Sequence, residues 1–404
     1  MFIFYLNKKF FLPLLIYKQS LFFPFMDPGS NNSGYKLYKV GYSLKDVTVI
    51  QAPIGKYLHR ADVNPFVKIC GRDGVYPIFV SPMASVTDEK NYKIWIDNRL
   101  TPVIPRSVKQ NIDFSARMKI AEETFVSISL QEAEEELLKM EVKPDQKKIY
   151  ICIDIANGNL QNLYHACKRL KKLYKDKISI MTGNVANPKT YKYYADNGID
   201  WMRVGSGLGS RCITACNTSI YYPPATLLDE LNREKILYAK ENNGNAPTKI
   251  ILDGGITNFD EIMKALALGA DAVMSGYLFA LAEEACGEIG YSKNIQEYAK
   301  GNYLIKEEYD RLGKEEKKEM KKFRDYYGMS TKKAQNIVNG KATKTSEGIS
   351  KPVLIEYPVA KWVDNMQSYM RSAMSYTNSG NLKEFQENTQ LIILGGTGDY
   401  CYRK

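Results

Sequence analysis

The chain has little of what a zinc site or a disulfide-bonded framework requires. Its 404 residues include two histidines and seven cysteines. The number of cysteines is odd, they are spread along the chain, and no pair has the CxxC spacing that is typical of zinc ligands. These features argue against a structural zinc ion and against a disulfide framework, and they fit a reducing compartment. We therefore expect a cytoplasmic protein.

Long hydrophobic runs are also missing. The uncharged run from Phe10 to Tyr17 is too short to cross a bilayer, and a proline interrupts it. A signal peptide is the alternative for this region, but no small-residue cleavage site follows it. We expect residues 1–34 to be a disordered or non-essential extension, with Met26 as an alternative start, and we expect no membrane partner.

Positive charge is in excess, but it is not concentrated. The formal net charge of +11 is compatible with a nucleic-acid-binding surface. Lysine and arginine are nevertheless scattered among asparagine, tyrosine and glutamate, without a basic block that has interleaved aromatic residues. A compositional bias with mild steering of an anionic substrate explains the charge as well. We expect no nucleic-acid partner. Hydrophobic residues at 44% and charged residues at 25% are ordinary for a globular protein.

Eight short apolar runs alternate with helical patterns along the chain. Their hydrophobicity is continuous rather than alternating, which is typical of parallel strands buried on both faces. Eight alternations predict one TIM barrel, a (β/α)8 fold of class α/β, with a doubly wound sheet as the alternative. The expected strands are residues 77–81, 101–105, 124–129, 149–154, 178–182, 200–204, 249–253 and 272–276.

Capping signals mark two of the intervening helices. Asn187, followed by a proline, is expected to cap a helix that ends at Gly198. Asn258 and Glu261 have the spacing of a capping box, and Gly269 stands where the glycine after a helix belongs. The signals support helices between the expected strands.

Two segments lie outside this repeat. The charged stretch 287–322 is expected to be helical with a solvated face, and a further helix is expected at 360–374. We divide the chain into the N-terminal extension, a barrel domain at 35–395 that includes a flap or insertion at 287–350, and a tail at 396–404.

Glycine-rich loops follow the last three expected strands, where active sites of this fold lie. The loop at 204–214 contains Cys212, and backbone N–H dipoles in such a loop favour a thiolate. A tight turn beside a structural cysteine is the alternative. Asp253 with two glycines follows the seventh strand, and Gly276 follows the eighth. Loops at these two places commonly bind phosphate, and Asp253 is placed to accept hydrogen bonds from ribose hydroxyls.

Six motifs in order resemble the IMP dehydrogenase/GMP reductase family, over residues 45–393. The longest are VGSGLGSRCIT, which is similar to the family's catalytic loop, and the segment from Asp253 to Gly276, which is similar to its phosphate-binding segment. The other four are DIANG (Asp154–Gly158), GNV (Gly183–Val185), YYGMS (Tyr326–Ser330) and SEG (Ser346–Gly348).

The resemblance implies a role for each matching residue. Catalysis falls to Cys212 as the covalent nucleophile, with Thr214 and Glu347 assisting proton transfer. A purine nucleotide, GMP or IMP, would contact Ser210, Asp253, Gly255, Gly276, Tyr326, Met329, Ser330 and Glu347. The nicotinamide cofactor would contact Asp154, Asn157, Gly158, Asn184, Arg203 and Gly205. A potassium ion would be held by the carbonyls of Gly207, Gly209 and Cys212. The family's habit further implies a homotetramer.

Four modest features favour the reductase over the dehydrogenase. DIANG is closer to the reductase's cofactor motif, and there is no room between the second and fourth strands for the paired regulatory modules that many dehydrogenases carry. Residues 331–346 contain neither the arginine nor the tyrosine with which the dehydrogenase activates water, and Glu347 matches the reductase's glutamate. We expect NADPH-dependent reduction of GMP to IMP. An IMP dehydrogenase that uses NAD, or a degenerate purine-nucleotide-binding barrel without activity, is the alternative.

Several residues depart from the family pattern. Ala84 replaces the family's aspartate, Ala215 stands where arginine or glutamine is usual, and Tyr277 stands where a small residue is usual. The bulk of Tyr277 would narrow the phosphate pocket. Because Cys212 and its expected partners are retained, an enzyme is favoured over a binding protein.

Overall fold

The computed structural model describes residues 40–395, except 107–112, 329, 340–344 and 347. The expected N-terminal extension, the tail at 396–404, Met329 and Glu347 lie outside the described residues. The described residues from Gly41 onward belong to one compact unit, and the features below lie within it.

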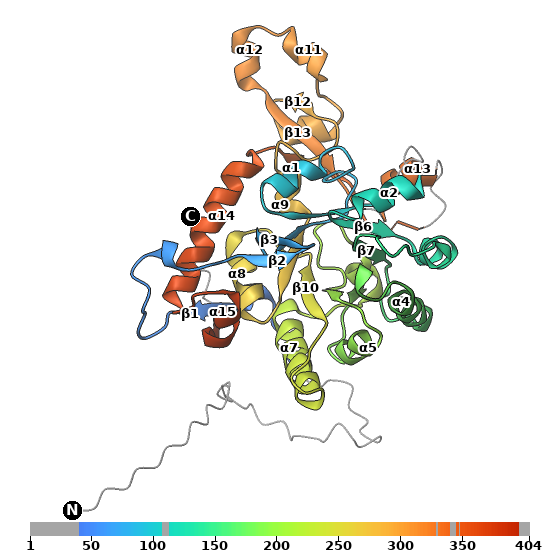
Figure 1. The fold of residues 1–404 in the computed structure, drawn as a ribbon. Coiled ribbons are helices and arrows are strands. Elements are labelled where there is room, and N and C mark those ends of the chain that lie inside the picture. The colour runs from blue at the N-terminus through green and yellow to red at the C-terminus, as the bar shows by residue number, and fades with distance from the viewer. Residues whose placement is uncertain (1–39, 107–112, 329, 340–344, 347, 396–404) are drawn as a thin grey trace, which may run out of the picture. The chain divides into compact units, whose positions relative to one another are not determined.

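Eight parallel strands close into a barrel at the centre of this unit (Figure 1). The last strand pairs with the first in parallel, with Val273 opposite Ile78. This closure confirms the TIM barrel and rules out the doubly wound sheet. The strands are β4 (Ile78–Val80), β5 (Thr101–Ile104), β6 (Phe125–Ile128), β7 (Ile149–Asp154), β8 (Ile178–Val185), β9 (Trp201–Val204), β10 (Lys249–Asp253) and β11 (Ala272–Ser275).

Aromatic side chains fill the interior of the barrel. Phe79 meets Phe125 and Trp201 edge-on, with ring centroids 5.9 and 5.3 Å apart, an arrangement that adds to the hydrophobic gain of burial. A hairpin of β2 (Val67–Ile69) and β3 (Arg72–Val75) packs onto the same interior cluster. Because β3 leads directly into β4, this hairpin covers the amino-terminal end of the barrel. The loops at the carboxyl end are left to build a site.

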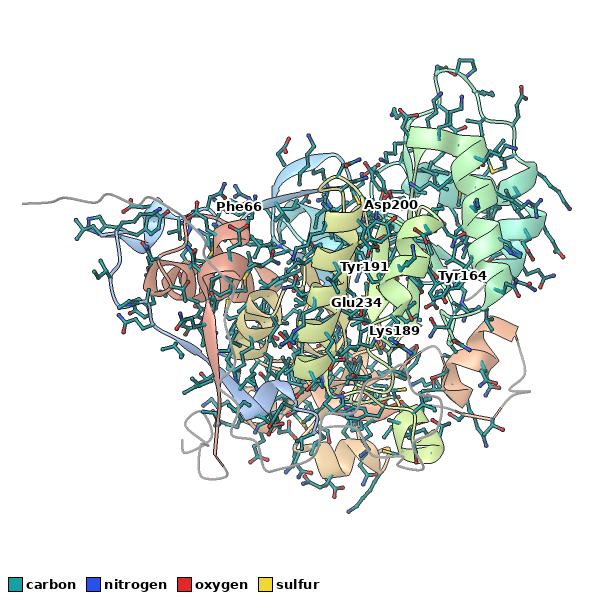
Figure 2. All side chains as sticks on the ribbon, turned by 90° about the horizontal axis from the view of Figure 1, so that it is seen from below. Phe66, Tyr164, Lys189, Tyr191, Asp200 and Glu234 are labelled. Atoms are coloured by element: carbon teal, nitrogen blue, oxygen red, sulfur yellow. The ribbon has the colours of Figure 1, made fainter. Side chains whose placement is uncertain are left out.

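Helices surround the barrel, as expected. They are α1 (Tyr92–Asp97), α2 (Phe114–Ile120), α3 (Leu130–Glu135), α4 (Gln161–Tyr174), α5 (Thr190–Asp196), α6 (Thr214–Thr218), α7 (Pro224–Glu241), α8 (Phe259–Ala267) and α9 (Tyr277–Ala280). Four short 3-10 helices accompany them, at Leu44–Asp46, Arg60–Asp62, Leu137–Lys139 and Lys175–Lys177. Polar anchors tie the helices to the residues just before the strands: the Tyr191 hydroxyl donates to the carbonyl of Thr248 over 3.0 Å, and Lys171 pairs with Asp200 at 2.6 Å. Tyr191 and Asp200 are labelled in Figure 2.

The capping prediction for α8 is confirmed, whereas α5 begins later than predicted. The Asn258 N–H donates to the Glu261 carboxylate over 3.1 Å at the start of α8, and Gly269 follows its end with φ +101°. Helix α5 begins three residues after Asn187. The side chain of Asn187 accepts from the N–H of Lys189, and its carbonyl accepts from that of Thr190, so a turn precedes the regular helix.

The prediction of a helical segment at 287–322 is wrong in part. Three short helices occur, but two strands flank them and form an antiparallel sheet with a third strand near residue 350. The strands are short and paired over long sequence distances, so local periodicity does not reveal them. The elements are β12 (Gly290–Ser292), α10 (Ile295–Ala299), α11 (Lys306–Asp310), α12 (Lys314–Glu319), β13 (Lys321–Tyr326) and β14 (Lys351–Leu354), with α13 (Lys332–Asn339) between the last two. The segment projects beyond the barrel in Figure 1, and the residues of α11 and α12 are mostly exposed.

The C-terminal part returns to the start of the barrel unit. The expected helix is present as α14 (Val359–Tyr376), followed by α15 (Leu382–Asn388) and β15 (Gln390–Ile393), which were not expected. Strand β15 pairs antiparallel with β1 (Val47–Ile50). None of the helices in the described part of the chain is long and apolar enough to span a bilayer.

The buried capping box of α8 provides a test of the fold. The Glu261 carboxylate accepts hydrogen bonds from the N–H and hydroxyl of Thr257 and from the N–H of Asn258. We expect Glu261→Ala to lower the free energy of unfolding by about 1–2 kcal/mol, because these donors lose their acceptor. Urea denaturation followed by circular dichroism measures the change. The exposed Glu307, in the first turn of α11, supplies the control Glu307→Ala, and an equal loss in both variants would contradict the assignment.

Candidate active site

A buried ion network joins the carboxyl ends of four neighbouring strands. Arg203, at the end of β9, donates to Asp154 at the end of β7 over 2.8 Å and to Asp253 at the end of β10 over 2.7 Å. The Asn184 amide, from β8, donates to the same Asp253 oxygen over 2.8 Å. The structure thus brings together four residues that the sequence predicted for cofactor and ribose binding.

Arg203 keeps its positive charge in this network. Burial alone would lower the pKa of Arg203, but the carboxylates of Asp253 and Asp154 outweigh it and hold that pKa well above its usual value. The second oxygen of Asp253, Oδ1, accepts no hydrogen bond from any described residue. It is therefore free to accept one from a ligand, as the expected ribose contact requires.

Cys212 lies on the loop after β9, immediately before the short helix α6. Its Sγ is 3.3 Å from the Thr214 hydroxyl oxygen, and its N–H donates to the carbonyl of Gly209 over 2.9 Å. The side chain is half-buried. A thiol in this position has a hydroxyl neighbour and is still accessible, which suits a nucleophile.

The segment that carries the SEG motif lies against this loop. Cys212 and Gly348 form an antiparallel bridge, and the N–H of Ile349 donates to the carbonyl of Arg211 over 2.9 Å. A Cβ added to Gly348 would lie 2.9 Å from the hydroxyl of Ser330. The late motifs therefore reach the catalytic loop, as expected, while Glu347 and Met329 lie outside the described residues.

Three neighbouring loops, after β9, β10 and β11, each have a backbone N–H group without a described partner. The N–H groups of Ser210, Gly255 and Gly276 donate to no acceptor in the described part of the chain. Gly276 is buried, so its N–H is open to an acceptor from a ligand or water. Gly254, with φ +92°, lies so close to the preceding loop that an added Cβ would be 3.0 Å from the nitrogen of Gly209. Backbone N–H groups of adjacent loops can form an anion site.

Tyr326 faces this cluster. A Cβ added to Gly276 would lie 2.7 Å from the Tyr326 hydroxyl, so a larger residue there would have to displace the tyrosine. The described partner of that hydroxyl is the sulfur of Met83 at 3.5 Å, a weak acceptor. Burial raises the pKa of Tyr326, so the phenol keeps its proton and can donate it to a stronger acceptor.

The other predicted residues are placed as follows. Asn157 is exposed, and Gly158 is locked by hydrogen bonds from its N–H to Asn184 and to its carbonyl from Tyr194. The carbonyl of Gly205 accepts from the Asn184 amide over 3.0 Å. The carbonyl of Gly209 accepts the Cys212 N–H, whereas those of Gly207 and Cys212 accept none from described residues. Carbonyl oxygens of this kind suit a potassium ion.

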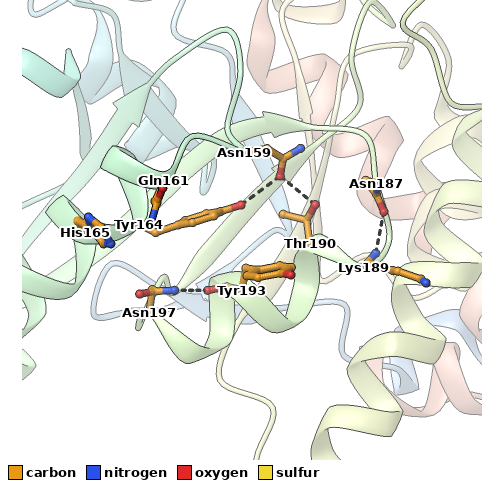
Figure 3. Close-up of a pocket in the computed structure, with 9 residues that line it drawn as sticks. All are labelled: Asn159, Gln161, Tyr164, His165, Asn187, Lys189, Thr190, Tyr193 and Asn197. Carbon is orange, nitrogen blue, oxygen red and sulfur yellow. Dashed lines mark hydrogen bonds between the residues drawn. The ribbon is translucent and has the colours of Figure 1, made fainter.

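A separate polar pocket of about 610 Å³ lies between α4 and α5 (Figure 3). Its inner wall is tied together by Asn159, whose side-chain oxygen accepts from the hydroxyls of Tyr164 and Thr190 at 3.1 and 2.9 Å. Asn159 directly follows the DIANG motif, but no predicted site residue lines the pocket. It adjoins the candidate site without including Cys212.

Sequence reasoning missed two residues of the site, Arg211 and Met83. The sequence VGSGLGSRCIT contains a signal for Arg211, because it is the one charged residue in this glycine-rich loop. Met83 has no such signal, because its contact with Tyr326 joins positions 243 residues apart.

Fold and site together define a TIM barrel with a cysteine nucleophile candidate and with backbone N–H groups that have no described acceptor in the loops after its last three strands. A family model described as "IMP dehydrogenase / GMP reductase domain" matches residues 106–399. The chain belongs to this family of oxidoreductases.

Relatives named GMP reductase are similar over most of the chain. The one from Buchnera aphidicola subsp. Baizongia pistaciae is 30% identical over 318 residues, which are 78% of this chain and 77% of the relative. The one from Buchnera aphidicola subsp. Schizaphis graminum is 31% identical over 68% of this chain and 69% of the relative. That of Vibrio atlanticus is 28% identical over 71% and 74%.

The ion network can be tested through Arg203→Met. Two buried carboxylates would lose their counter-charge, and we expect the free energy of unfolding to fall by about 3–5 kcal/mol near pH 7.

Urea midpoints near pH 7 measure this effect. Arg233→Met is the control, because Arg233 pairs with Asp229 on the exposed face of α7, and its loss should cost about 0–1 kcal/mol. An equal loss of stability in Arg203→Met and Arg233→Met would contradict the prediction.

Proposed function

We propose that this protein is a GMP reductase, which converts GMP to IMP and ammonia with NADPH through a covalent bond between Cys212 and purine C2. The observation that carries the proposal is the placement of Cys212 Sγ 3.3 Å from the Thr214 hydroxyl, on the loop that adjoins both Asp253 and the free N–H groups. The names of the similar proteins point to the same reaction.

The nucleotide would be held by groups that have no partner, or only a weak one, among the described residues. Its phosphate would accept from the N–H groups of Ser210, Gly255 and Gly276 and from the hydroxyl of Tyr326. Asp253 Oδ1 would accept from a ribose hydroxyl. The base is assigned to Met329, Ser330 and Glu347, which would place C2 at Cys212.

The chemistry then divides into two steps. The Cys212 thiolate adds to C2 and the amino group departs as ammonia, with Thr214 and Glu347 as the proposed carriers of the proton that it needs. A thioimidate between Cys212 and the purine remains. Hydride addition at C2 and departure of the thiolate give IMP. Thr214 thereby shares a proton with the sulfur at both ends of the cycle.

NADPH, when bound, supplies the hydride. Its nicotinamide half is assigned to Asp154, Asn157, Gly158, Asn184 and Gly205, while Arg203, buried between two carboxylates, would hold these groups in place. Potassium at the carbonyls of Gly207, Gly209 and Cys212 would brace the catalytic loop. A homotetramer remains a prediction from the family.

The absorbance of the reduced nicotinamide tests the proposal in both directions. We expect purified protein in potassium buffer to consume NADPH only when GMP is present, and Cys212→Ser to lose about 10³-fold or more of this rate. Cys216→Ser is the matched control, since Cys216 is exposed and has no part in the mechanism; it should keep the rate. Formation of NADH from IMP and NAD would instead identify a dehydrogenase, and binding without turnover would contradict an enzyme.

A further inference from the structure

We propose that Arg211 binds the 5′-phosphate of the substrate and makes the site selective for the nucleotide over the uncharged nucleoside. This inference rests on the proposed nucleotide site and adds to it a cation that the motif comparison did not assign.

Arg211 has no carboxylate partner in the described part of the chain, although it is half-buried. Its Nη1 donates to the carbonyl of Ser210 over a long 3.3 Å, and its buried Nε has no acceptor. Arg117 and Arg203, by contrast, are each paired with acidic residues. A guanidinium with unused donors and no counter-charge is suited to bind an anion from solution.

The guanidinium lies over the ring of Tyr326, the residue that borders Gly276. Its central carbon is 4.9 Å from the centroid of the Tyr326 ring, and the ring of Tyr277 lies 6.2 Å from that of Tyr326. The Tyr326 hydroxyl in turn borders Gly276, whose buried N–H is unpaired. The aromatic face positions Arg211 without using up its N–H donors. Arg211 and Gly276 therefore both adjoin Tyr326, and a phosphate bound at the Gly276 N–H would lie near the guanidinium.

The backbone of Arg211 is also fixed. Its carbonyl accepts from Ile349, and the next residue, Cys212, bridges Gly348. A phosphate held there would meet an already positioned cation, and little ordering entropy would be lost on binding. Burial lowers the pKa of Arg211, but an arginine remains charged near neutral pH.

Two ligands in this reaction carry phosphate groups, the nucleotide and the dinucleotide, and binding measurements separate them. Isothermal titration calorimetry with GMP, guanosine and NADPH compares the wild type with Arg211→Leu and Arg211→Gln. We expect both variants to weaken GMP binding about 10- to 100-fold, the loss of one charge-assisted contact. Guanosine and NADPH should bind as in the wild type. Arg233→Leu is the control and should bind all three unchanged.

The possible failures are distinct. A wild type that binds no GMP contradicts the proposed function itself. A wild type that binds GMP, together with variants that bind it equally well, overturns only the role of Arg211. Variants that lose affinity only for NADPH, or that lose affinity equally for GMP and guanosine, also overturn the role of Arg211. If Arg211→Leu does not fold, Arg211→Gln, which keeps a polar side chain, supports or overturns the inference alone.

Discussion

The site depends on the ion pairs that the Arg203 guanidinium makes with Asp154 and Asp253. Four adjacent strands end in polar residues, and parallel pairing brings those ends to one edge of the barrel, where two carboxylates would repel each other without a cation between them. Arg203 neutralises both and leaves one oxygen of Asp253 free. Arg203 is buried and connects the two carboxylates, which accounts for a charged residue in the otherwise apolar strand β9.

The loops above this network are held by close backbone contacts. The glycines after β9 and β10 approach each other so closely that a side chain at Gly254 would press on Gly209. The small antiparallel sheet adds a second wall: β13 ends at Tyr326 and delivers its ring to Gly276, and the stretch before β14 bridges Cys212. The charged segment 287–322 therefore leads into the strand that delivers Tyr326 to the site.

The sequence predicted the barrel well because its strands are continuous hydrophobic runs buried on both faces, a signal that lies within each run. The same local logic fails for β12, which has three residues, and for β13, whose charged residues resemble those of a helix. Both strands pair with distant segments. The motifs located most of the candidate site, but they could not reveal how its members bond to each other. Arg203 was assigned to the cofactor, yet its bonds run to Asp154 and Asp253. The contact between Met83 and Tyr326 has no sequence signal.

The departures from the family pattern are consistent with a working site once the contacts are considered. Ala215 packs against Gly207, and a Cβ added to Gly207 would collide with the Cβ of Ala215. The small side chain of Ala215 therefore suits this tight turn. Tyr277 was expected to narrow the phosphate pocket. Its ring lies 6.2 Å from that of Tyr326, and the N–H of Gly276 has no acceptor among the described residues. Arg211 and Cys212 are consecutive residues on one constrained loop. Under the proposals made above, a phosphate held at the first of them fixes the position of the thiol at the second, so that binding one end of the nucleotide orients the group that attacks the other.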